Sequence, residues 1–554
     1  MSKYTIGVDF GTESGRAAVV DVSDGRELAD STFFYPHGVM DEELPDGTKL
    51  GFDWALQYPE DYLQVFYNTI PDVMKASGVS PDDIIGIGVD FTACTVMPVK
   101  KDGTPLCMMK EFEHEPNAYV KLWKHHAAQD KANLINEKAA EMGESWIERY
   151  GGKVSSEWEL PKAWQILDEA PHVYDAADYI VEAADWVVWQ LCGVLGKNTC
   201  CAGYKGLWHY KEGYPSKEFL KALDPRLENF VEDKLDYPIS QLCDRVGGLT
   251  ADMAQKLGLN EGTTVTTAII DAHVAVPASK ITKPNVLLAI MGTSTCHILV
   301  SEEEHKVPGI CGVVAGGVYP GLYAYEAGQA CVGDHFSWFV KNCVPAEYVK
   351  DAESKGMNIH KYLREKVQDQ KPGESGLIAL DWWNGNRSIL VDGDLTGMML
   401  GMTLQTKPEE MYRALIEATA YGTRKIVETY QSNGVKVDEI IASGGISQKD
   451  PMTMQIYADI LNKPIKIAGT TQCGALGSAI YAAVAAGSEN GGYDDIFTAS
   501  GAMGKLKDTV YTPIKENAEI YDKLYEEYNI LHDYFGTGVN DVMKRLKNIK
   551  KSVK

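Results

Sequence analysis

Two short glycine-containing turns occupy corresponding places in the two halves of the chain. The first is DFGTESGR at residues 9–16 and the second is MGTST at residues 291–295, and each lies between two apolar runs. An apolar strand, a tight turn in which glycine supplies unusual dihedral angles, and a second strand predict a β-hairpin in each half. Such turns expose backbone N–H groups and small hydroxyl side chains, which suits a phosphate group. Two hairpins that face each other would hold one polyphosphate from both sides.

A third pattern supports this interpretation, because a single Gly-Thr hairpin is most often only a hairpin. A β-branched run ends in Ser443-Gly444-Gly445, and Asp450-Pro451 then predicts the start of a helix. Two glycines at the end of a strand allow a flat ring to approach the backbone closely. The alternative is that these glycines only turn the chain.

Composition limits the class of protein and its partners. With 554 residues the chain is too long for one core, so we expect two large domains. A formal net charge of −25 repels nucleic acid and anionic membranes, so we expect neither as a partner. No apolar stretch reaches the roughly 20 residues of a membrane span, and the first strand follows the N-terminus without the pattern of a signal peptide. The eleven cysteines contain no CxxC pair, which predicts reduced thiols and a cytoplasmic location.

The order of expected elements is similar in the two halves. Residues 277–285 are polar, contain two prolines and predict the crossover between domains at 1–280 and 281–554. Residues 84–99 repeat the strand–turn–strand pattern with Asp90 at the turn, and residues 321–340 predict another hairpin-like stretch. Helices are expected at 59–76, at 408–430, from Gly474 onward, and in a charged surface appendage at 515–554. Hairpin strands followed by helices in both halves predict an α/β protein with two related domains.

Several motifs, taken in order, resemble the FGGY family of carbohydrate kinases within the sugar kinase, Hsp70 and actin superfamily. They are DFGTESGR (9–16), VDFTACTV (89–96), IIDAH (269–273), MGTST (291–295) and the block that begins SGGISQKDP (443–459). Each piece is unspecific, but their order and spacing cover nearly the whole chain. The resemblance implies an α/β fold of two duplicated ribonuclease H-like (actin-like ATPase) domains with a central cleft. It also implies ATP-dependent phosphorylation of a sugar, with Mg²⁺ as cofactor and a homodimer as the assembly.

Further details resemble the branch of this family that phosphorylates L-ribulose to L-ribulose 5-phosphate in L-arabinose catabolism. These details are LWKHH (122–126), GYKGLWH (203–209), IIDAHVA (269–275) and YEAGQ (325–329). Many relatives carry an Asp-x-Arg pair after the first-domain tryptophan, whereas Trp123 is followed here by Lys-His-His. Other substrates stay open, namely D-ribulose, D-xylulose or ribitol. A nucleotide-driven conformational protein and a non-catalytic sugar sensor are the alternatives from other classes, and the intact Asp9 and Asp271 argue against them.

Two aspartates are the candidates for the chemistry itself. Asp271 ends a buried strand, where a carboxylate can accept the proton of a sugar hydroxyl. The residue alone supports a helix cap about equally, and the resemblance favours the catalytic base. Asp9 also follows an apolar strand, and the resemblance makes Asp9, with Asp271, the carboxylates on the magnesium side. The alternative for Asp9 is a turn-forming aspartate.

The resemblance assigns the remaining contacts residue by residue. The sugar contacts are Ala93 through its backbone, Lys205 as a donor, Asp271, and Glu326 as an acceptor. The phosphate contacts are Thr12, Ser14 and Arg16 from the first domain and Gly292 and Thr293 from the second. The ribose and adenine contacts are Gly333, Ser337, Gly444, Gly445 and Gln448. The alternatives are a solvated surface group for a lone Lys or Glu, a strand-surface arginine for Arg16, and core packing rather than a pocket wall for Trp123 and Trp208.

Overall fold

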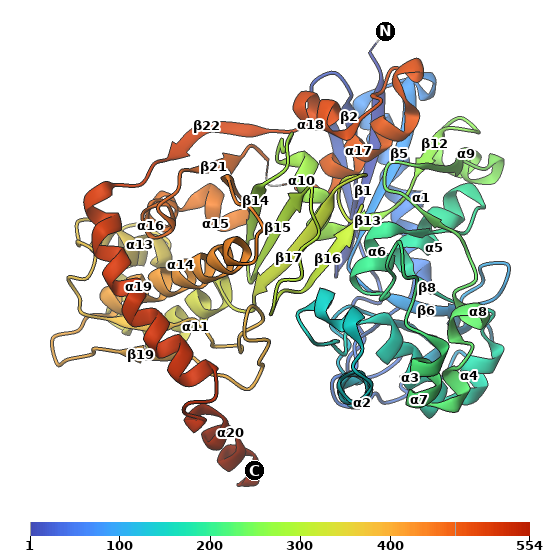
Figure 1. The fold of residues 1–554 in the computed structure, drawn as a ribbon. Coiled ribbons are helices and arrows are strands. Elements are labelled where there is room, and N and C mark those ends of the chain that lie inside the picture. The colour runs from blue at the N-terminus through green and yellow to red at the C-terminus, as the bar shows by residue number, and fades with distance from the viewer. Residues whose placement is uncertain (1, 471, 554) are drawn as a thin grey trace.

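The computed structural model describes residues 2–470 and 472–553 as a mixed α/β protein built on two seven-stranded sheets of the same design (Figure 1). In the first sheet β1 pairs antiparallel with β2, β2 pairs with β3, and β1 pairs parallel with β5. Its strands are β1 (Tyr4–Phe10), β2 (Ser14–Asp21), β3 (Glu27–Phe34), β5 (Ile84–Phe91), β11 (Arg245–Gly248), β12 (Thr264–Thr266) and β13 (Ile269–Ile270). The hairpin predicted at 9–16 is therefore confirmed.

The second sheet repeats this order. The hairpin β14–β15 is antiparallel, β15 pairs antiparallel with β17, and β14 pairs parallel with β20. Its strands are β14 (Val286–Met291), β15 (Thr295–Ser301), β16 (Gly312–Ala315), β17 (Tyr323–Gln329), β20 (Glu439–Ser443), β21 (Ile465–Ala468) and β22 (Leu506–Tyr511). The second hairpin and the duplicated α/β architecture are thus confirmed as well.

Helices cover both sheets, and two of them lie between the sheets. Helix α1 (Pro59–Ser77) packs on β2 and β3, whereas α10 (Asp271–Ala278) and α17 (Cys473–Ala486) pack against each other, with α17 also on β1 and β5. A large apolar core joins the first sheet, these two helices and the inner face of the second sheet. The outer face of the second sheet is covered by α14 (Pro408–Ser432), α16 (Pro451–Leu461) and α19 (Lys515–Gly536). The helices predicted at 59–76, at 408–430 and from Gly474 are confirmed within a residue or two.

A smaller lobe with its own core is built from the segment between β3 and α1, which contains β4 (Leu56–Gln57), and from the long stretch that follows β5. A four-stranded sheet in this lobe consists of β4, β7 (Val120–Lys121), β6 (Val96–Val99) and β8 (Tyr179–Glu182). The helices that contribute to its core include α2 (Gln129–Met142), α3 (Glu159–Glu169), α4 (Pro171–Ala176), α7 (Lys217–Leu223) and α8 (Phe230–Lys234). Helices α5 (Ala183–Cys192) and α6 (Thr199–Tyr204) instead bury their side chains in the first core. The chain does form two strands at 84–99, β5 and β6, but they do not pair with each other as in the predicted hairpin-like unit. Both edges of β5 are taken by parallel neighbours, so the chain must leave that sheet, and β6 pairs with β7 and β8 instead. Asp90 accordingly lies within β5 and not at a turn.

The hairpin-like stretch predicted at 321–340 is also wrong in its second half. β17 is followed by α11 (Gly333–Cys343), a helix that buries Phe336 and Phe339. These two aromatics are three residues apart, the spacing of one helical face, and they face the second core. The burial of these two aromatics on one face stabilises a helix in the stretch where the sequence had indicated the second half of a hairpin.

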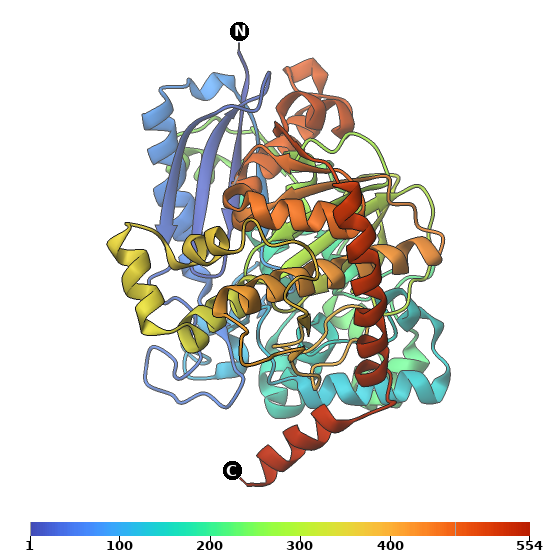
Figure 2. The same cartoon turned by 90° about the vertical axis from the view of Figure 1, so that its left-hand side faces the viewer.

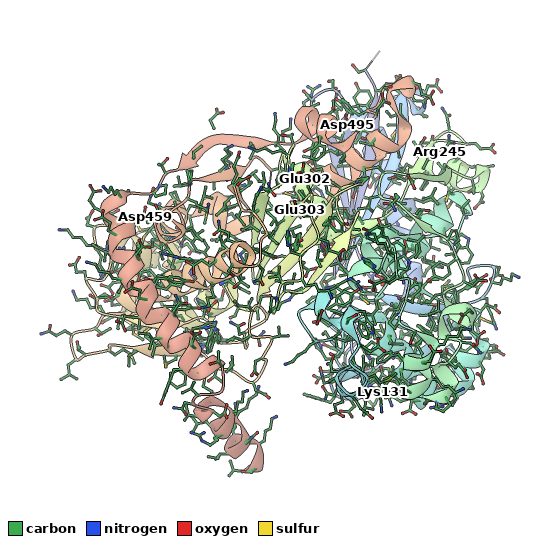
Figure 3. The ribbon with its side chains drawn as sticks, viewed as in Figure 1. Lys131, Arg245, Glu302, Glu303, Asp459 and Asp495 are labelled. Atoms are coloured by element: carbon green, nitrogen blue, oxygen red, sulfur yellow. The ribbon has the colours of Figure 1, made fainter. Side chains whose placement is uncertain are left out.

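The surface appendage predicted at 515–554 is correct for its last part alone. Helix α19 buries Tyr521, Tyr525 and Tyr528 in the second core. Asp459 on α16 lies beside α19 (Figure 3), accepting hydrogen bonds from the Ile514 backbone N–H at 2.7 Å and from the Asn517 side chain at 2.8 Å. By contrast, α20 (Val542–Ser552) projects from the body of the molecule in both views (Figure 1, Figure 2).

The remaining helices and strands are short. The elements are α9 (Ala251–Leu257), α12 (Ala346–Ser354), α13 (Ile359–Lys366), α15 (Gly444–Lys449), α18 (Ile496–Met503), β9 (Lys197–Asn198), β10 (Ile239–Ser240), β18 (Ile378–Leu380) and β19 (Met398–Leu400). Two further expectations, about membrane spans and cysteines, can be compared with the described residues. Within residues 2–470 and 472–553, none of the helices combines the length and apolar character that crossing a membrane requires. All eleven cysteines are free thiols, as their spacing predicted.

Candidate functional site

The four residues predicted to contact a sugar line one cavity of about 200 Å³. Ala93 lies in the turn after β5, Lys205 follows the end of α6, Asp271 is the first residue of α10, and Glu326 lies within β17. The first three come from the first half of the chain and Glu326 from the second. The cavity therefore lies between the two halves, and residues distant in sequence converge there.

Three carboxylates meet where parallel strands end. Asp9 in β1 lies opposite Asp90 in β5, and β13, which also pairs parallel with β5, leads directly into Asp271. Because neighbouring parallel strands end at the same edge of a sheet, side chains at those ends lie close together; ligands of open α/β sheets bind at this edge. Asp9 and Asp271 were predicted from their places after apolar runs and from the family resemblance, whereas Asp90 was missed because it was assigned to a turn.

The environment of Asp271 suits a proton acceptor. Burial raises the pKa of Asp271 to about 7, with a further contribution from the negative charge of Asp9. Its Oδ1 atom accepts a hydrogen bond from the backbone N–H of Ala272 at 2.7 Å. The N-cap of α10 is Ile270, so Asp271 is not the helix cap that its position also allowed. A carboxylate whose pKa lies near neutrality is matched to general base catalysis.

Glu326 is the centre of a buried charge cluster. Its carboxylate lies 3.0 Å from Nη2 of Arg387, 3.6 Å from Nζ of Lys205 and 3.5 Å from Nε2 of His273. Burial by itself raises the pKa of Glu326, but the positive charges of Lys205 and Arg387 outweigh it and lower the pKa to about 2. Burial lowers the pKa of His273 to about 4, so its imidazole is neutral near pH 7. The cavity therefore offers an ionised acceptor, two cationic donors and a neutral imidazole to a polyhydroxylated ligand.

Arg387 and His273 were not among the predicted site residues. His273 stands two residues after Asp271 within the IIDAH motif, so its proximity could have been inferred from α10. Arg387 lies in the stretch DWWNGNRS at 381–388, which has neither strand nor helix periodicity. Its richness in tryptophan, asparagine and glycine is the signal of a functional loop that the sequence offered.

The first hairpin turn lies beside this cavity, but its predicted residues differ in orientation. The turn is closed by a hydrogen bond from the Gly11 N–H to the Ser14 carbonyl at 2.9 Å. The hydroxyl of Thr12 accepts a hydrogen bond from the indole N–H of Trp123 at 3.1 Å, and Trp123 lines the sugar-side cavity. The side chain of Arg16 instead forms ion pairs with Glu27 and Asp30 on β3, at 3.0 and 3.2 Å. None of the predicted contacts Thr12, Ser14 and Arg16 is among the residues that line this cavity, and Arg16 is held away on β3.

Most residues predicted for the second phosphate turn and the adenosine line another cavity, of about 530 Å³: Gly292, Thr293, Gly333, Ser337 and Gly445. The start of α11 is tied to the second turn by hydrogen bonds from the Gly333 N–H to the Gly292 carbonyl at 3.0 Å and from the Val332 N–H to the Thr293 carbonyl at 2.9 Å.

The other two predicted adenosine contacts lie at the edge of that region. Gly444 has φ +87°, and a Cβ there would lie 2.4 Å from the Met291 carbonyl oxygen, so glycine is required where β20 ends against β14. Gln448 donates to the Ala468 carbonyl at 2.6 Å and so is held toward β21. The lining also contains residues that were not predicted, the basic side chains His360, Lys361, Arg364 and Lys449.

The carboxylates are compatible with a magnesium ion shared with a nucleotide. Within residues 2–470 and 472–553, no group of three or more histidine, cysteine, aspartate or glutamate side chains is arranged to hold a metal. Mg²⁺ needs fewer, since it keeps several waters and is bound by one or two carboxylates together with phosphate oxygens. Oδ1 of Asp90 is buried and has no hydrogen-bond partner among these residues, and burial raises the pKa of both Asp9 and Asp90. A cation beside this pair would relieve that cost.

Comparison with known proteins agrees with this arrangement. Models of the N-terminal and C-terminal domains of the FGGY family of carbohydrate kinases match residues 4–277 and 287–486. A curated relative named ribulokinase, from Halalkalibacterium halodurans, is 58% identical over 550 residues, which is 99% of this chain and 98% of that protein. Another, from Geobacillus thermodenitrificans, is 55% identical over 554 residues, covering 100% and 98%. The solved structure of ligand-bound xylulose kinase from Lactobacillus acidophilus has the same fold, with a TM-score of 0.79 at 19% identity over 97% of this chain and 99% of that one. The chain therefore belongs to the FGGY family of carbohydrate kinases.

Proposed function

We propose that this chain transfers the terminal phosphoryl group of ATP to the 5-hydroxyl of L-ribulose. The observation that carries the proposal is the cavity of about 200 Å³ in which Asp271 lies with Lys205 and Glu326, next to the first hairpin turn. The similarity to two proteins named ribulokinase supports ribulose as the substrate. L-arabinose catabolism would then be the pathway.

The sugar would be held by groups of opposite hydrogen-bonding character. Glu326, ionised by its cationic neighbours, would accept hydrogen bonds from hydroxyl groups. Lys205 would donate to the carbonyl or to a hydroxyl oxygen, and Ala93 would contribute its backbone. A ketopentose has one carbonyl and four hydroxyls, so a site with both donors and acceptors leaves few of its polar groups unpaired.

Asp271 would accept the proton of the 5-hydroxyl as that oxygen attacks the γ-phosphorus of ATP. The bond between the γ-phosphorus and the bridging oxygen breaks, and ADP leaves. A pKa of about 7 gives a base that is about half ionised at pH 7 and basic enough to take the proton.

The nucleotide would lie between the two turns, because phosphoryl transfer depends mainly on positioning and charge neutralisation. Thr12 and Ser14 would contact the phosphates from one side and Gly292 and Thr293 from the other. Arg16 would act on the phosphates only if it left its ion pairs on β3. Gly333, Ser337, Gly444, Gly445 and Gln448 would surround the ribose and adenine. Mg²⁺, with Asp9 and Asp271 as the carboxylates that would hold it directly or through water, would neutralise phosphate charge.

A coupled ADP-release assay tests the proposal. It uses ATP and Mg²⁺ with L-ribulose, D-ribulose, D-xylulose, L-xylulose, ribitol and glycerol. Fastest turnover with L-ribulose supports the proposal. Preference for another member keeps the reaction and replaces the substrate, whereas no stimulation by any of them, from folded protein that binds ATP, contradicts the kinase.

The proposal also covers the domain boundary, the cellular location, the assembly and the absence of a nucleic acid partner. We place the boundary between the domains at 280/281, although α17 and α18 from the second half pack on the first sheet or beside it. We propose a cytoplasmic enzyme that works as a homodimer and has no nucleic acid partner. Chromatography with light scattering would test the assembly.

A further inference from the structure

We propose that Lys162 is a positioning residue whose ammonium group holds the Ala93–Cys94 turn and the Leu122–Trp123 segment in place at the wall of the sugar cavity. The inference rests on the proposed function, since it concerns the same cavity. Lys162 lies on α3, does not itself line the cavity, and is 0% exposed.

The ammonium group of Lys162 is fully used by backbone carbonyls. Nζ donates to the carbonyl of Cys94 at 2.6 Å, to that of Leu122 at 2.8 Å and, more weakly, to that of Lys121 at 3.4 Å. An ammonium group has three N–H donors and no acceptor, so these contacts account for all of them. A buried lysine without partners would be very costly. Here it has three, and they come from two segments that are also paired at Val96 and Lys121, where β6 meets β7.

The first of these segments is strained and is held from both sides. Cys94 has φ +46°, a left-handed conformation that is unfavourable for a residue with a side chain. Its carbonyl accepts from Lys162, while its N–H donates to Oε2 of the buried Glu182 at 3.0 Å. β6, which follows the turn, is paired with β8 (Figure 1). Glu182 is the last residue of β8. The ammonium group of Lys162 thus binds the carbonyl of Cys94 and the carboxylate of Glu182 binds its N–H, so both sides of the strained residue are held. Ala93, which precedes Cys94, is thereby held at the wall of the cavity.

The second segment connects the sugar side with the phosphate turn. Leu122, whose carbonyl binds Lys162, precedes Trp123, which lines the cavity and donates its indole N–H to Thr12 at 3.1 Å. Together with the pairing of Val96 and Lys121, this ammonium group sets the distance between Ala93 and Trp123. Loss of that group should loosen the sugar wall and leave the adenosine cavity, which is built from the other half, unchanged.

The chain contains a matched control, Lys234. It is also buried, at 8% exposure, and its Nζ donates to the carbonyls of Tyr174 at 2.8 Å and Ala177 at 2.6 Å in the same lobe. Neither Tyr174 nor Ala177 lines the sugar cavity. Replacing Lys234 removes the same kind of interaction without touching the Ala93 turn.

The test compares Lys162→Met with Lys234→Met, because methionine keeps the unbranched shape and loses the donors. We expect both variants to melt at lower temperature than the wild type. We expect Lys162→Met alone to raise the KM for the best sugar of the panel by about tenfold, with the KM for ATP within about twofold of the wild type. A sugar KM that is unchanged in Lys162→Met, or raised equally in Lys234→Met, overturns the inference.

A second measurement needs no variant and tests whether the turn at Cys94, whose N–H is bound by Glu182, is held before the sugar arrives. Hydrogen exchange at the Cys94 amide is followed in the wild type without ligands. Slow exchange, comparable to that of the β5 amides, supports a turn that is held before the sugar arrives; fast exchange that slows only with sugar overturns it. The experiment also separates this inference from the proposed function. If the wild type phosphorylates no sugar, the proposed function fails, whereas exchange at Cys94 still reports on the turn.

Discussion

At the scale of single residues, the carboxylate group is found in three different environments in this protein. Asp271 is raised in pKa by burial and by Asp9, Asp90 is buried and receives a hydrogen bond from the Ser478 hydroxyl at 2.6 Å, and Glu326 is kept ionised by cations. In the proposed function the first would be the base and the third a sugar acceptor, while Asp90 is the partner of Asp9, and these differences come from their neighbours. The residue type alone does not distinguish these roles.

Replacing Asp271 by asparagine should remove the base and keep the shape. Asparagine can still accept the Ala272 N–H, so the fold should be retained. We expect kcat to fall by about 10² to 10⁴, with the KM for ATP little changed. Asp252→Asn is the control, because Asp252 forms an exposed ion pair with Lys256 on α9 at 2.8 Å. Steady-state kinetics check both, and a kcat for Asp271→Asn within a few-fold of the wild type would refute the base.

The pKa of Asp271 predicts the pH dependence of the reaction. A base works when ionised, so kcat/KM for the sugar should be constant above about pH 7 and fall by about tenfold per pH unit below it. The fall in kcat/KM begins near pH 7 because burial raises the pKa of Asp271 to about 7. Glu326, whose pKa is lowered to about 2, should contribute nothing in this range. A profile that stays flat down to about pH 5 would contradict the assignment.

At the scale of secondary-structure elements, α17 holds the two halves together. A Cβ on Gly7 of β1 would lie 1.7 Å from the Ala475 carbonyl oxygen, and one on Gly88 of β5 would lie 1.9 Å from that of Ser478. The helix therefore rests directly on the backbone of the two strands that carry Asp9 and Asp90. A Cβ on Gly474 at the start of α17 would lie 2.5 Å from the Asp9 side chain, so the position of the helix also sets that of the carboxylate.

Gly7→Ala should consequently destabilise the protein. The added methyl group must displace α17 from β1, which we expect to lower the free energy of unfolding by at least about 2 kcal/mol. Gly393→Ala is the matched control, because a Cβ at Gly393 would have nothing within 4 Å. Urea denaturation measures both. Equal midpoints for Gly7→Ala and the wild type would mean that the contact between helix and strand is not tight.

At the scale of the whole molecule, the two halves face each other across a larger cavity of about 690 Å³. Glu157 and Lys205 line it from the first half and Asn386 and Arg387 from the second. Glu157, Lys205 and Arg387 also line the sugar-side cavity, so the larger space leads directly to it. Such an opening admits substrates, but it also admits water, which competes with the sugar as phosphoryl acceptor.

We therefore expect the two halves to close when both ligands bind. Small-angle X-ray scattering should give a smaller radius of gyration with L-ribulose and a non-hydrolysable ATP analogue together than without ligands. The protein with L-arabinitol, which lacks the carbonyl, serves as the comparison. Identical scattering with and without both substrates, at concentrations that saturate the kinetics, would argue for a site that stays open.

The local features of this protein were readable from its residues. Glycine turns at 9–16 and 291–295 produce the two hairpins, and Asp450 caps α16 by accepting the Thr453 N–H at 3.1 Å. These outcomes depend on the conformations that a few neighbouring residues allow. The duplicated order of elements followed from such local patterns, whereas the family was inferred from the resemblance of the motifs to those of known kinases.

Pairing and convergence had to come from the tertiary structure. β6 leaves the first sheet because the edges of β5 are already occupied, and α19 is buried because its tyrosines meet the second core. Arg387 reaches Glu326 across 61 residues of sequence, and Lys162 reaches Cys94 across 68. The physical reason is the same in each case. A short segment determines its own backbone conformation, whereas the edges, cavities and charges that it meets are created by parts of the chain far from it in sequence.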